Sequence, residues 1–178
     1  MNTDSSIAQA SRSLPDARWE LDPSASTAEF RVPHFWGLIT VKGHLTILDG
    51  HLEITDGHVD QMALTIDATS VHTGIPSRDR HLRSDDFFDA ERHPVVRFRS
   101  DNVAEIAEDR VRVQGQLDAA GEHVQLSIEA AIREAADTMT VDARTTIDQR
   151  ELGMTWSPLG MTRWPVTLTV HASLRRRP

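Results

Sequence analysis

The sequence predicts a mainly all-β domain, built as an antiparallel sheet that closes into a barrel or folds into a sandwich. From Phe30 onward, apolar residues recur mostly at every second position. This period is typical of a strand with one buried face and one solvated face. Short turn sequences separate the alternating stretches, and only one segment has helical character. Because parallel strands would need long helical crossovers, we expect antiparallel pairing.

The expected strands can be followed in order along the chain by their apolar positions. Polar residues such as Thr65, Arg112, Gln125, Asp142 and Thr167 stand between these positions. The alternating apolar residues are Leu64, Ile66 and Ala68; Val111, Val113 and Leu117; Val124, Leu126, Ile128, Ala130 and Ile132; Met139, Val141 and Ala143; and Val166, Leu168, Val170 and Ala172. We expect these side chains to share the interior of the domain.

Turn-forming residues stand between the alternating stretches. They are Asp49-Gly50, Asp56-Gly57, Ala120-Gly121 and the corner Ala135-Ala136-Asp137. Such short connections are typical of hairpins that join neighbouring antiparallel strands. We therefore expect a turn at each of these four places.

The alternation stops between Ile75 and His93, where we expect a short helical insert near residues 77–92. Ser77 and Ser84 could each cap the start of a short helix, because a serine oxygen accepts hydrogen bonds from free backbone N–H groups. Pro94 then ends the helical segment. A helical insert between two strands of a barrel would cover one opening as a lid.

Length and composition restrict the class of protein further. The chain has 178 residues, of which 39% are hydrophobic, which suits one domain rather than two large ones. No apolar run approaches the roughly 18 residues of a transmembrane helix. The absence of cysteine excludes disulfides, thiolate catalysis and cysteine-bound metals. A net charge of −8 disfavours nucleic acid as a partner.

The two ends of the chain differ from the middle. Residues 1–18 are polar and read as a disordered leader, residues 19–174 as the barrel domain, and residues 175–178 as a basic tail. The leader has no continuous apolar segment of the kind found in a signal peptide, so we predict a cytoplasmic protein. The basic tail could make transient contact with an anionic membrane surface, although a solvated tail is the favoured interpretation.

The segment from Arg78 to Asp89, followed by His93 to Ser100, closely resembles the signature of the YceI-like, polyisoprenoid-binding family. The resemblance extends upstream to Phe30, Val32, His34, Gly43 and the stretch Ala68–Thr73, and downstream to Ile147-Asp148 and Gly153-Met154, so that it spans Trp19 to Leu174. The sequence departs from the family pattern at Leu45, at Gln149 and Leu152, and in the stretch Asp118–Gly121. These departures keep the strand period and concern the ligand more than the fold.

The resemblance implies a lipocalin-like antiparallel barrel of about eight strands whose interior holds a long isoprenoid tail of the polyprenyl or quinone-precursor type. It implies a non-enzymatic binding or carrier protein for transport or storage, a homodimer, and relatives that are often exported. A barrel of about eight strands can either pack solid or enclose one slim ligand, and the sequence leaves both outcomes open. We expect no cofactor.

Apolar side chains that point inward, and bulky ones near strand ends and in loops, are the candidate ligand-binding residues. They are Phe30, Val32, Trp36, Leu64, Ile66, Leu82, Phe87, Phe88, Phe98, Val113, Leu126, Ile128, Met139, Val141, Met154, Trp156, Met161 and Trp164. The candidates for an anionic head group are Arg78, Arg80, His81 and Arg83, because arginine forks match phosphate oxygens. The alternative is that nearby acidic residues pair with these cations, as Asp79 beside Arg78 would if it fixed the lid to the barrel rim.

An enzyme is the main competing interpretation. His81 with Asp79 or Asp85 could act as an acid–base pair on an apolar substrate in the same cavity. However, the sequence contains no serine nucleophile elbow, phosphate-binding loop or closely spaced histidine pair. The remaining histidines, such as His34 and His51, are scattered, so we expect no metal site.

Overall fold

The computed structural model describes residues 16–157 and 164–177. The strands are β1 (Ala17–Leu21), β2 (Thr27–His34), β3 (Ile39–Thr55), β4 (His58–His72), β5 (Val95–Ala107), β6 (Arg110–Ala119), β7 (Glu122–Ala135), β8 (Thr138–Asp148) and β9 (Pro165–Arg176). One α-helix in this part of the chain, α1 (Pro76–Arg83), and three short 3₁₀ turns, η1 (Pro23–Ala25), η2 (Phe35–Gly37) and η3 (Gln149–Leu152), complete the fold.

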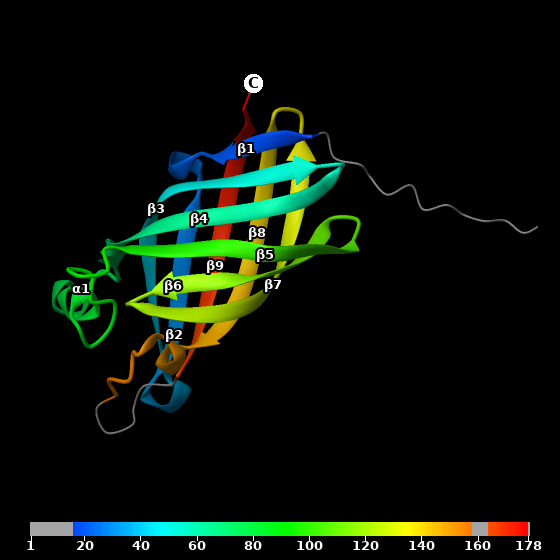
Figure 1. The fold of residues 1–178 in the computed structure, drawn as a ribbon. Helices are drawn as coiled ribbons and strands as arrows, with labels where there is room; N and C mark the ends of the chain where they lie inside the picture. Colours follow the sequence, from blue (N-terminus) through cyan, green and yellow to red (C-terminus); the bar gives the residue numbers. More distant parts are fainter. Residues whose placement is uncertain (1–15, 158–163, 178) are drawn as a thin grey trace, which may run out of the picture.

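The strands form one closed antiparallel barrel (Figure 1). Neighbours in sequence pair from β2 to β9, and β9 returns to pair with β2 and β1. β1 and β2 share one place in the ring, because both pair with β3 on one side and with β9 on the other. Counted in this way, the described strands make an eight-position ring. The predicted closed antiparallel barrel is confirmed, and a sandwich is excluded.

Three of the four predicted turns join neighbouring strands, and the fourth does not exist. Asp56-Gly57 and Ala120-Gly121 have positive φ at both residues, the backbone that tight hairpins favour, and Ala136 also has positive φ. Asp49-Gly50 lies inside β3, so the predicted turn there is wrong. The pairing of β3 with β4 shifts register between Ile47 and Asp49. The Asp-Gly pair therefore accompanies a bulge that bends a long strand.

The helical insert is present, but it holds one helix rather than two. Pro76 occupies the first turn of α1 and Ile75 is its N-cap, without a side-chain hydrogen bond, so Ser77 is not the cap. Ser84 ends α1 instead of starting a second helix, and its Oγ donates a hydrogen bond of 2.7 Å to the carbonyl oxygen of His81. Residues 84–93 then continue as turns that lead into β5.

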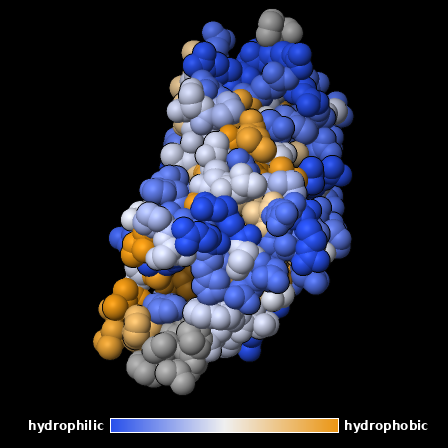
Figure 2. Space-filling view, turned by 90° about the vertical axis from the view of Figure 1, so that its left-hand side faces the viewer, coloured by the Kyte–Doolittle hydropathy of each residue, from blue (hydrophilic) through white to orange (hydrophobic). Residues whose placement is uncertain are grey.

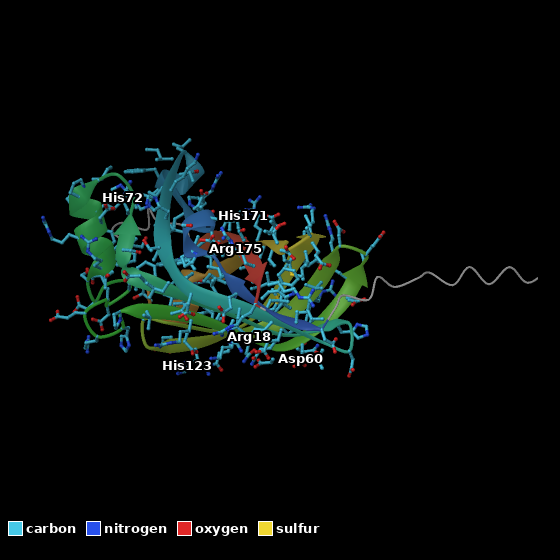
Figure 3. All side chains as sticks on the ribbon, turned by 90° about the horizontal axis from the view of Figure 1, so that it is seen from above. Arg18, Asp60, His72, His123, His171 and Arg175 are labelled. Atoms are coloured by element: carbon cyan, nitrogen blue, oxygen red, sulfur yellow. The ribbon has the colours of Figure 1, made fainter. Side chains whose placement is uncertain are left out.

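The interior is packed solid at one end of the barrel. This closed-end core contains Trp19, Leu52, Ile54, Val59, Val111, Val113, Ala130, Ile132, Met139, Val141, Ala172 and Leu174. A second buried group, which includes Phe30, Val71, Val96, Leu117 and Leu152, lies toward α1 and η3. Polar side chains such as His123 and Asp60 cover the outer wall (Figure 3). The space between the two apolar groups forms the candidate site.

The first and last strands, β1 and β9, include residues on either side of the predicted bounds 19–174. β1 begins at Ala17, and residues 1–15 of the predicted leader lie outside the described residues. β9 continues to Arg176, and Arg175 forms an ion pair of 2.8 Å with Asp22. Two of the three C-terminal arginines are therefore part of the barrel wall. None of the helices in the described chain is long and apolar enough to cross a membrane.

Candidate functional site

The barrel encloses an apolar cavity of about 800 Å³. Every strand from β2 to β9 contributes to its wall, and α1, η2 and η3 contribute to the end opposite the closed-end core. Its volume lies toward the upper end of the range of about 300–1,000 Å³ that is typical of small-molecule sites. Polar lining residues are few: Glu29, His34, His51, Ser77, Arg78, His81, Arg144, Thr145 and Gln149. The cavity suits an apolar ligand.

The barrel stays hollow because of the residues on its inner face. Alanines at several inward positions, among them Ala63, Ala119 and Ala143, are too small to reach across the ring. Larger inward side chains such as Leu126 and Ile128 remain partly exposed because they face the empty interior. From Val113 to Ala119, the cavity wall extends roughly 20 Å along β6 at about 3.3 Å per residue.

Most of the predicted ligand-binding residues line this cavity. They are Phe30, Val32, Leu64, Ile66, Leu82, Phe87, Phe88, Phe98, Val113, Leu126, Ile128, Val141, Met154 and Trp156. Met139 does not line it, because this side chain is 0% exposed within the closed-end core. Trp164 is also absent from the lining, and its ring lies 5.2 Å from the guanidinium carbon of Arg150. The side chain of Trp36 and all of Met161 lie outside the described residues.

Sequence reasoning missed many wall residues. They include Leu21, Ala28, Val41, Leu45, Leu52, Met62, Ala63, Val96, Ala119, Ile147, Leu152 and Leu174. Seven more, which were expected in the interior but not named as candidate ligand contacts, also line the wall: Leu117, Ala130, Ala143, Val166, Leu168, Val170 and Ala172. Alternation would have found most of them, since they follow the same inward parity as the predicted residues. Leu152 lies in η3, outside any strand, and no periodic signal marks it.

The open end of the cavity, which we call the mouth, is lined by aromatic side chains around His81. The His81 ring lies 4.4 Å from the ring of Trp156 and 5.2 Å from that of Phe87, both edge-on. Its Nε2 atom is 2.8 Å from Oδ2 of Asp86. His81 is thus a polar group held between two aromatic residues of the mouth.

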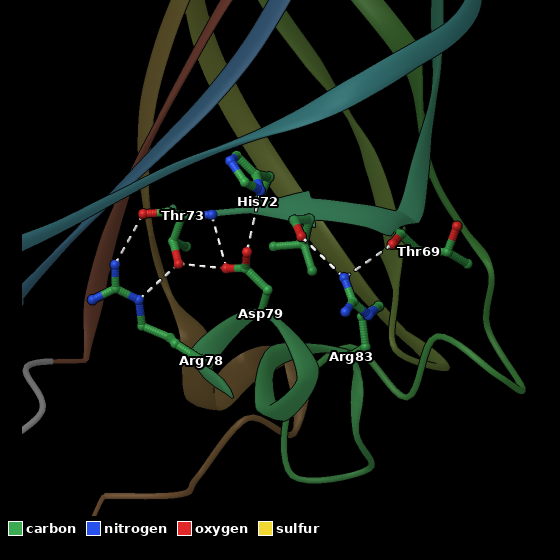
Figure 4. A network of polar contacts seen from close by, with 7 residues as sticks. Thr69, His72, Thr73, Arg78, Asp79 and Arg83 are labelled. Atoms are coloured by element: carbon green, nitrogen blue, oxygen red, sulfur yellow. Dashed lines mark hydrogen bonds and ion pairs between the residues drawn. The ribbon is translucent and has the colours of Figure 1, made fainter. Parts of the chain in front are cut away.

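A buried carboxylate fixes α1 to the end of β4 (Figure 4). Asp79 is 4% exposed, and its Oδ1 accepts hydrogen bonds from the backbone N–H of Thr73, at 2.8 Å, and from the Thr73 hydroxyl. Its Oδ2 lies 3.2 Å from Nδ1 of His72. His72 is the last residue of β4, and Thr73 is the residue after it. These contacts therefore attach the first turn of α1, the predicted lid, to the end of β4.

The surroundings of Asp79 also change its acidity. Burial would raise the pKa of its carboxyl group, because it disfavours the charged form. The hydrogen bonds from Thr73 and the charge interactions with His72 and Arg83 outweigh burial and lower the pKa below its usual value. Asp79 is therefore a carboxylate at neutral pH.

The four predicted head-group residues have different surroundings. Arg78 donates from Nε to the Thr73 hydroxyl, at 2.8 Å, and from a terminal nitrogen to the Thr73 carbonyl, yet it also lines the cavity. Arg83 points to the carbonyl oxygens of Val71 and Thr69 and does not line the cavity. Arg80 is exposed away from the cavity, with no hydrogen bond or ion pair within the described chain. The structure thus places only Arg78 and His81 on the cavity wall.

No group of three or more histidine, aspartate or glutamate side chains in the described part of the chain is arranged to hold a metal ion. The histidines nearest to one another are His44 and His72, whose ring centres are 5.1 Å apart. The site is therefore defined by its apolar surface and by the polar groups at its mouth.

The chain matches the model of the YceI-like domain family over residues 19–174. Protein YceI of Escherichia coli is 34% identical over 73 residues, which cover 41% of this chain and 38% of that protein. A UPF0312 protein of Vibrio parahaemolyticus is 27% identical over 107 residues. The matched stretch spans little more than half, 56%, of the length of that relative.

Solved structures share the barrel. BcnA of Burkholderia cenocepacia superposes with a TM-score of 0.77 at 16% identity, covering 86% of this chain and 98% of that one. A polyisoprenoid binding domain of Saccharophagus degradans superposes with a TM-score of 0.73 at 19% identity, covering 92% of this chain and all of that domain. At these identities the likeness establishes the fold.

Proposed function

The chain belongs to the YceI-like domain family, and from this membership and the shape of its barrel we propose that it binds a long apolar isoprenoid lipid and carries or stores it unchanged. The observation that carries the proposal is the apolar cavity of about 800 Å³ with polar groups gathered mainly at one end. The name of the related Saccharophagus degradans domain, which refers to polyisoprenoid binding, supports the same ligand class.

The volume of the cavity limits the length of the lipid. A water-sized group occupies about 30 Å³ in a liquid, so the cavity holds on the order of 25 such groups. A methylene group is of similar size, and each isoprene unit contributes five carbons. We therefore expect a tail of roughly five isoprene units inside the barrel, with any longer tail or head group outside it.

The energetics suit a carrier. Each buried CH₂ is worth about 0.8 kcal/mol relative to water, so a tail drawn from water would be bound almost irreversibly. A lipid tail in a bilayer is already in an apolar environment, however, and its transfer into the barrel costs or gains little. Selectivity must then come from the shape of the tail and from contacts with the head group at the mouth.

Of the four predicted head-group residues, Arg78 and His81 line the cavity at the mouth, where they could contact an anionic or carbonyl-bearing head group. Arg78 keeps a terminal nitrogen that is not involved in its hydrogen bonds to Thr73. Arginine and histidine donors suit phosphate and carbonyl oxygens. We propose that these two residues, rather than Arg80 or Arg83, bind the head group.

The direct test is to extract the purified full chain with organic solvent and to analyse the extract by mass spectrometry. We expect a prenyl lipid in near-stoichiometric amount from the wild-type protein, and less of it from an Arg78→Gln variant that folds normally. Protein that elutes empty and takes up no prenyl lipid from vesicles would contradict the proposal.

A second candidate is an enzyme that acts on an apolar substrate in the same cavity. The distance of 2.8 Å between His81 Nε2 and Asp86 Oδ2 at the mouth is the observation that favours it, because such a pair can transfer protons. An enzyme would convert the extracted lipid over time, and a His81→Ala variant would stop the conversion while still binding. A lipid recovered unchanged after incubation excludes this function.

Two further features belong to the proposal. We propose a cytoplasmic location. We also propose a homodimer, as the family resemblance implies. Fractionation of cells that produce the full-length protein, and sedimentation of the purified protein, test these two statements.

A further inference from the structure

The tip of the β2–β3 hairpin exposes large apolar side chains within the part of the chain that the structure describes. Leu38 is 86% exposed, Ile39 is 53% exposed and Phe35 is 39% exposed. Large apolar side chains that lie next to one another are usually buried. A contiguous group of them on the surface marks an interaction site. In Figure 2, hydrophobic side chains gather at the lower edge of the face that carries α1.

This apolar tip is continuous with the cavity. Phe35 and Ile39 also line the cavity wall, as does Trp156, which is 38% exposed on another side of the mouth. A long apolar molecule could therefore pass from a surface that contacts the tip into the barrel without crossing water. Such continuity points to an apolar medium as the partner.

Two cations stand behind the tip on the outer face of the same hairpin. Arg31 on β2 and Lys42 on β3 are register partners, and both are exposed. Among the residues that the structure describes, neither forms an ion pair. Like charges directly opposite each other in a sheet are unfavourable, so this pair costs stability unless an anion lies beside it.

The spacing between the tip and the cations puts the two cationic side chains within reach of the lipid phosphates. Each cation is four residues from the tip, counted from Arg31 to Phe35 and from Lys42 to Leu38, which is about 13 Å along the strands. Apolar groups of surface-bound proteins enter about 5–10 Å below the head groups. With the tip inserted to that depth, the backbone at Arg31 and Lys42 would lie a few Å outside the lipid phosphates. Their long side chains would then reach the phosphates.

Several carboxylates at this end of the barrel are engaged within the protein. Asp79 is buried against Thr73, Asp148 pairs with Arg150 at 2.5 Å, and Asp86 contacts His81. The overall charge of −8 therefore does not predict the local charge around the hairpin tip. On the hairpin itself, Glu29 is also exposed, but it lies two residues further from the tip than Arg31, so the charged groups nearest to the tip are Arg31 and Lys42.

We propose that the β2–β3 hairpin docks the mouth of the barrel onto an anionic phospholipid bilayer, with Phe35, Leu38 and Ile39 entering the acyl region and Arg31 and Lys42 contacting the phosphates. This docking is a property of the outer surface and is independent of which lipid the cavity holds. The basic residues at the C-terminus do not take part. Arg175 and Arg177 are paired with Asp22 and Glu20, and Arg176 lies opposite Trp19 at the closed end of the barrel, away from the mouth.

Flotation of the full chain with phosphatidylcholine vesicles, with and without phosphatidylglycerol, tests the proposal. We expect the wild type to float with the anionic vesicles, less with the neutral ones, and less again as salt is raised. Leu38→Asp should weaken binding by about ten- to a hundredfold, since it removes one buried leucine. The double variant Arg31→Gln and Lys42→Gln should weaken binding to anionic vesicles by at least roughly tenfold.

Matched controls lie at the closed end of the barrel. Ile106→Asp changes an apolar residue that is 39% exposed on β5, and the double variant Arg110→Gln and Arg176→Gln removes two exposed cations. Both should float like the wild type. Wild-type protein that stays unbound at low salt would overturn the proposal, as would equal binding by Leu38→Asp and Ile106→Asp.

The test also separates a bilayer from a second copy of the chain. If Leu38→Asp changes the sedimenting species from dimer to monomer, and the wild type does not float, the tip is a contact between subunits and membrane docking is wrong. The vesicles contain no isoprenoid, so the absence of a bound prenyl lipid in the extraction experiment would leave this result unaffected.

Discussion

Thr73 donates both its backbone N–H and its hydroxyl to one oxygen of Asp79, and these bonds join the first turn of α1 to the end of β4. Arg78 in turn donates to the same Thr73 hydroxyl and to the Thr73 carbonyl. A single threonine therefore links two side chains of the lid to the barrel. The lid over the cavity is a fixed part of the wall at this point.

Replacing Asp79 with alanine should destabilise the protein. The variant leaves the Thr73 N–H and hydroxyl without their acceptor in a partly buried place, which costs about 1–3 kcal/mol. Urea denaturation measures the loss, and Asp85→Ala, an exposed change in the turn that follows α1, is the matched control. Equal stability of the two variants would show that the link contributes nothing.

The same carboxylate predicts a pH dependence. The pKa of Asp79 is lowered in the folded protein, so its contribution to stability is complete above the unfolded pKa of about 3.9 and is lost as pH falls through the lowered value. The difference in unfolding free energy between wild type and Asp79→Ala should therefore be constant near neutral pH and shrink below about pH 4. Other carboxylates with lowered pKa, such as Asp118 and Asp148, affect both proteins alike. A difference that does not vary with pH would contradict this assignment.

Gly115 should not tolerate a side chain. A Cβ atom there would lie 2.2 Å from the carbonyl oxygen of Arg99 and 2.8 Å from the ring of Phe98. One of these groups is backbone, so Gly115→Ala must move β5 against β6, which costs roughly 1–3 kcal/mol. Gln114→Ala, an exposed change beside it, should change the midpoint of thermal unfolding much less. A Gly115→Ala variant as stable as the wild type would show that the strands separate freely at this point.

The strands could be predicted because their inner faces alternate strictly, as from Val124 to Ile132, and because a closed ring is the arrangement that leaves no strand edge free. Asp49-Gly50 was misassigned because the same pair serves a hairpin turn and a bulge, and only the pairing of β3 with β4 distinguishes them. Ser77 was misassigned because Pro76 already provides the start of the helix, and Ser84 because a serine can also cap the end of a helix, as it does here for α1.

The wall of the cavity could be predicted where it is built from strand residues that alternate between inward and outward positions. Leu126 and Ile128 face the cavity as alternation requires, but Met139 follows the same parity and lies in the closed-end core. Position along the barrel axis decides between these two outcomes, and it depends on strand stagger, which the sequence does not reveal. The directions in which Arg78, Arg80 and Arg83 point likewise depend on the residue at which α1 begins, because that residue decides which side of the helix each arginine occupies.

Filling the cavity from one wall should reduce the lipid that the protein holds. Ile128 points inward from β7 and is only partly buried because it faces the cavity, so Ile128→Trp should fit into empty space and take up roughly one isoprene unit. The neighbouring Ser127 is exposed on the outer face, and Ser127→Trp adds the same side chain outside the barrel. Mass spectrometry of lipid exchanged from vesicles that contain prenyl lipids of several lengths should show a shift toward shorter tails, or a lower occupancy, for Ile128→Trp alone. Both variants should unfold at urea concentrations close to that of the wild type, because neither disturbs a packed contact. If Ile128→Trp binds the same lipids in the same amount as Ser127→Trp, the lipid does not occupy the interior of the barrel.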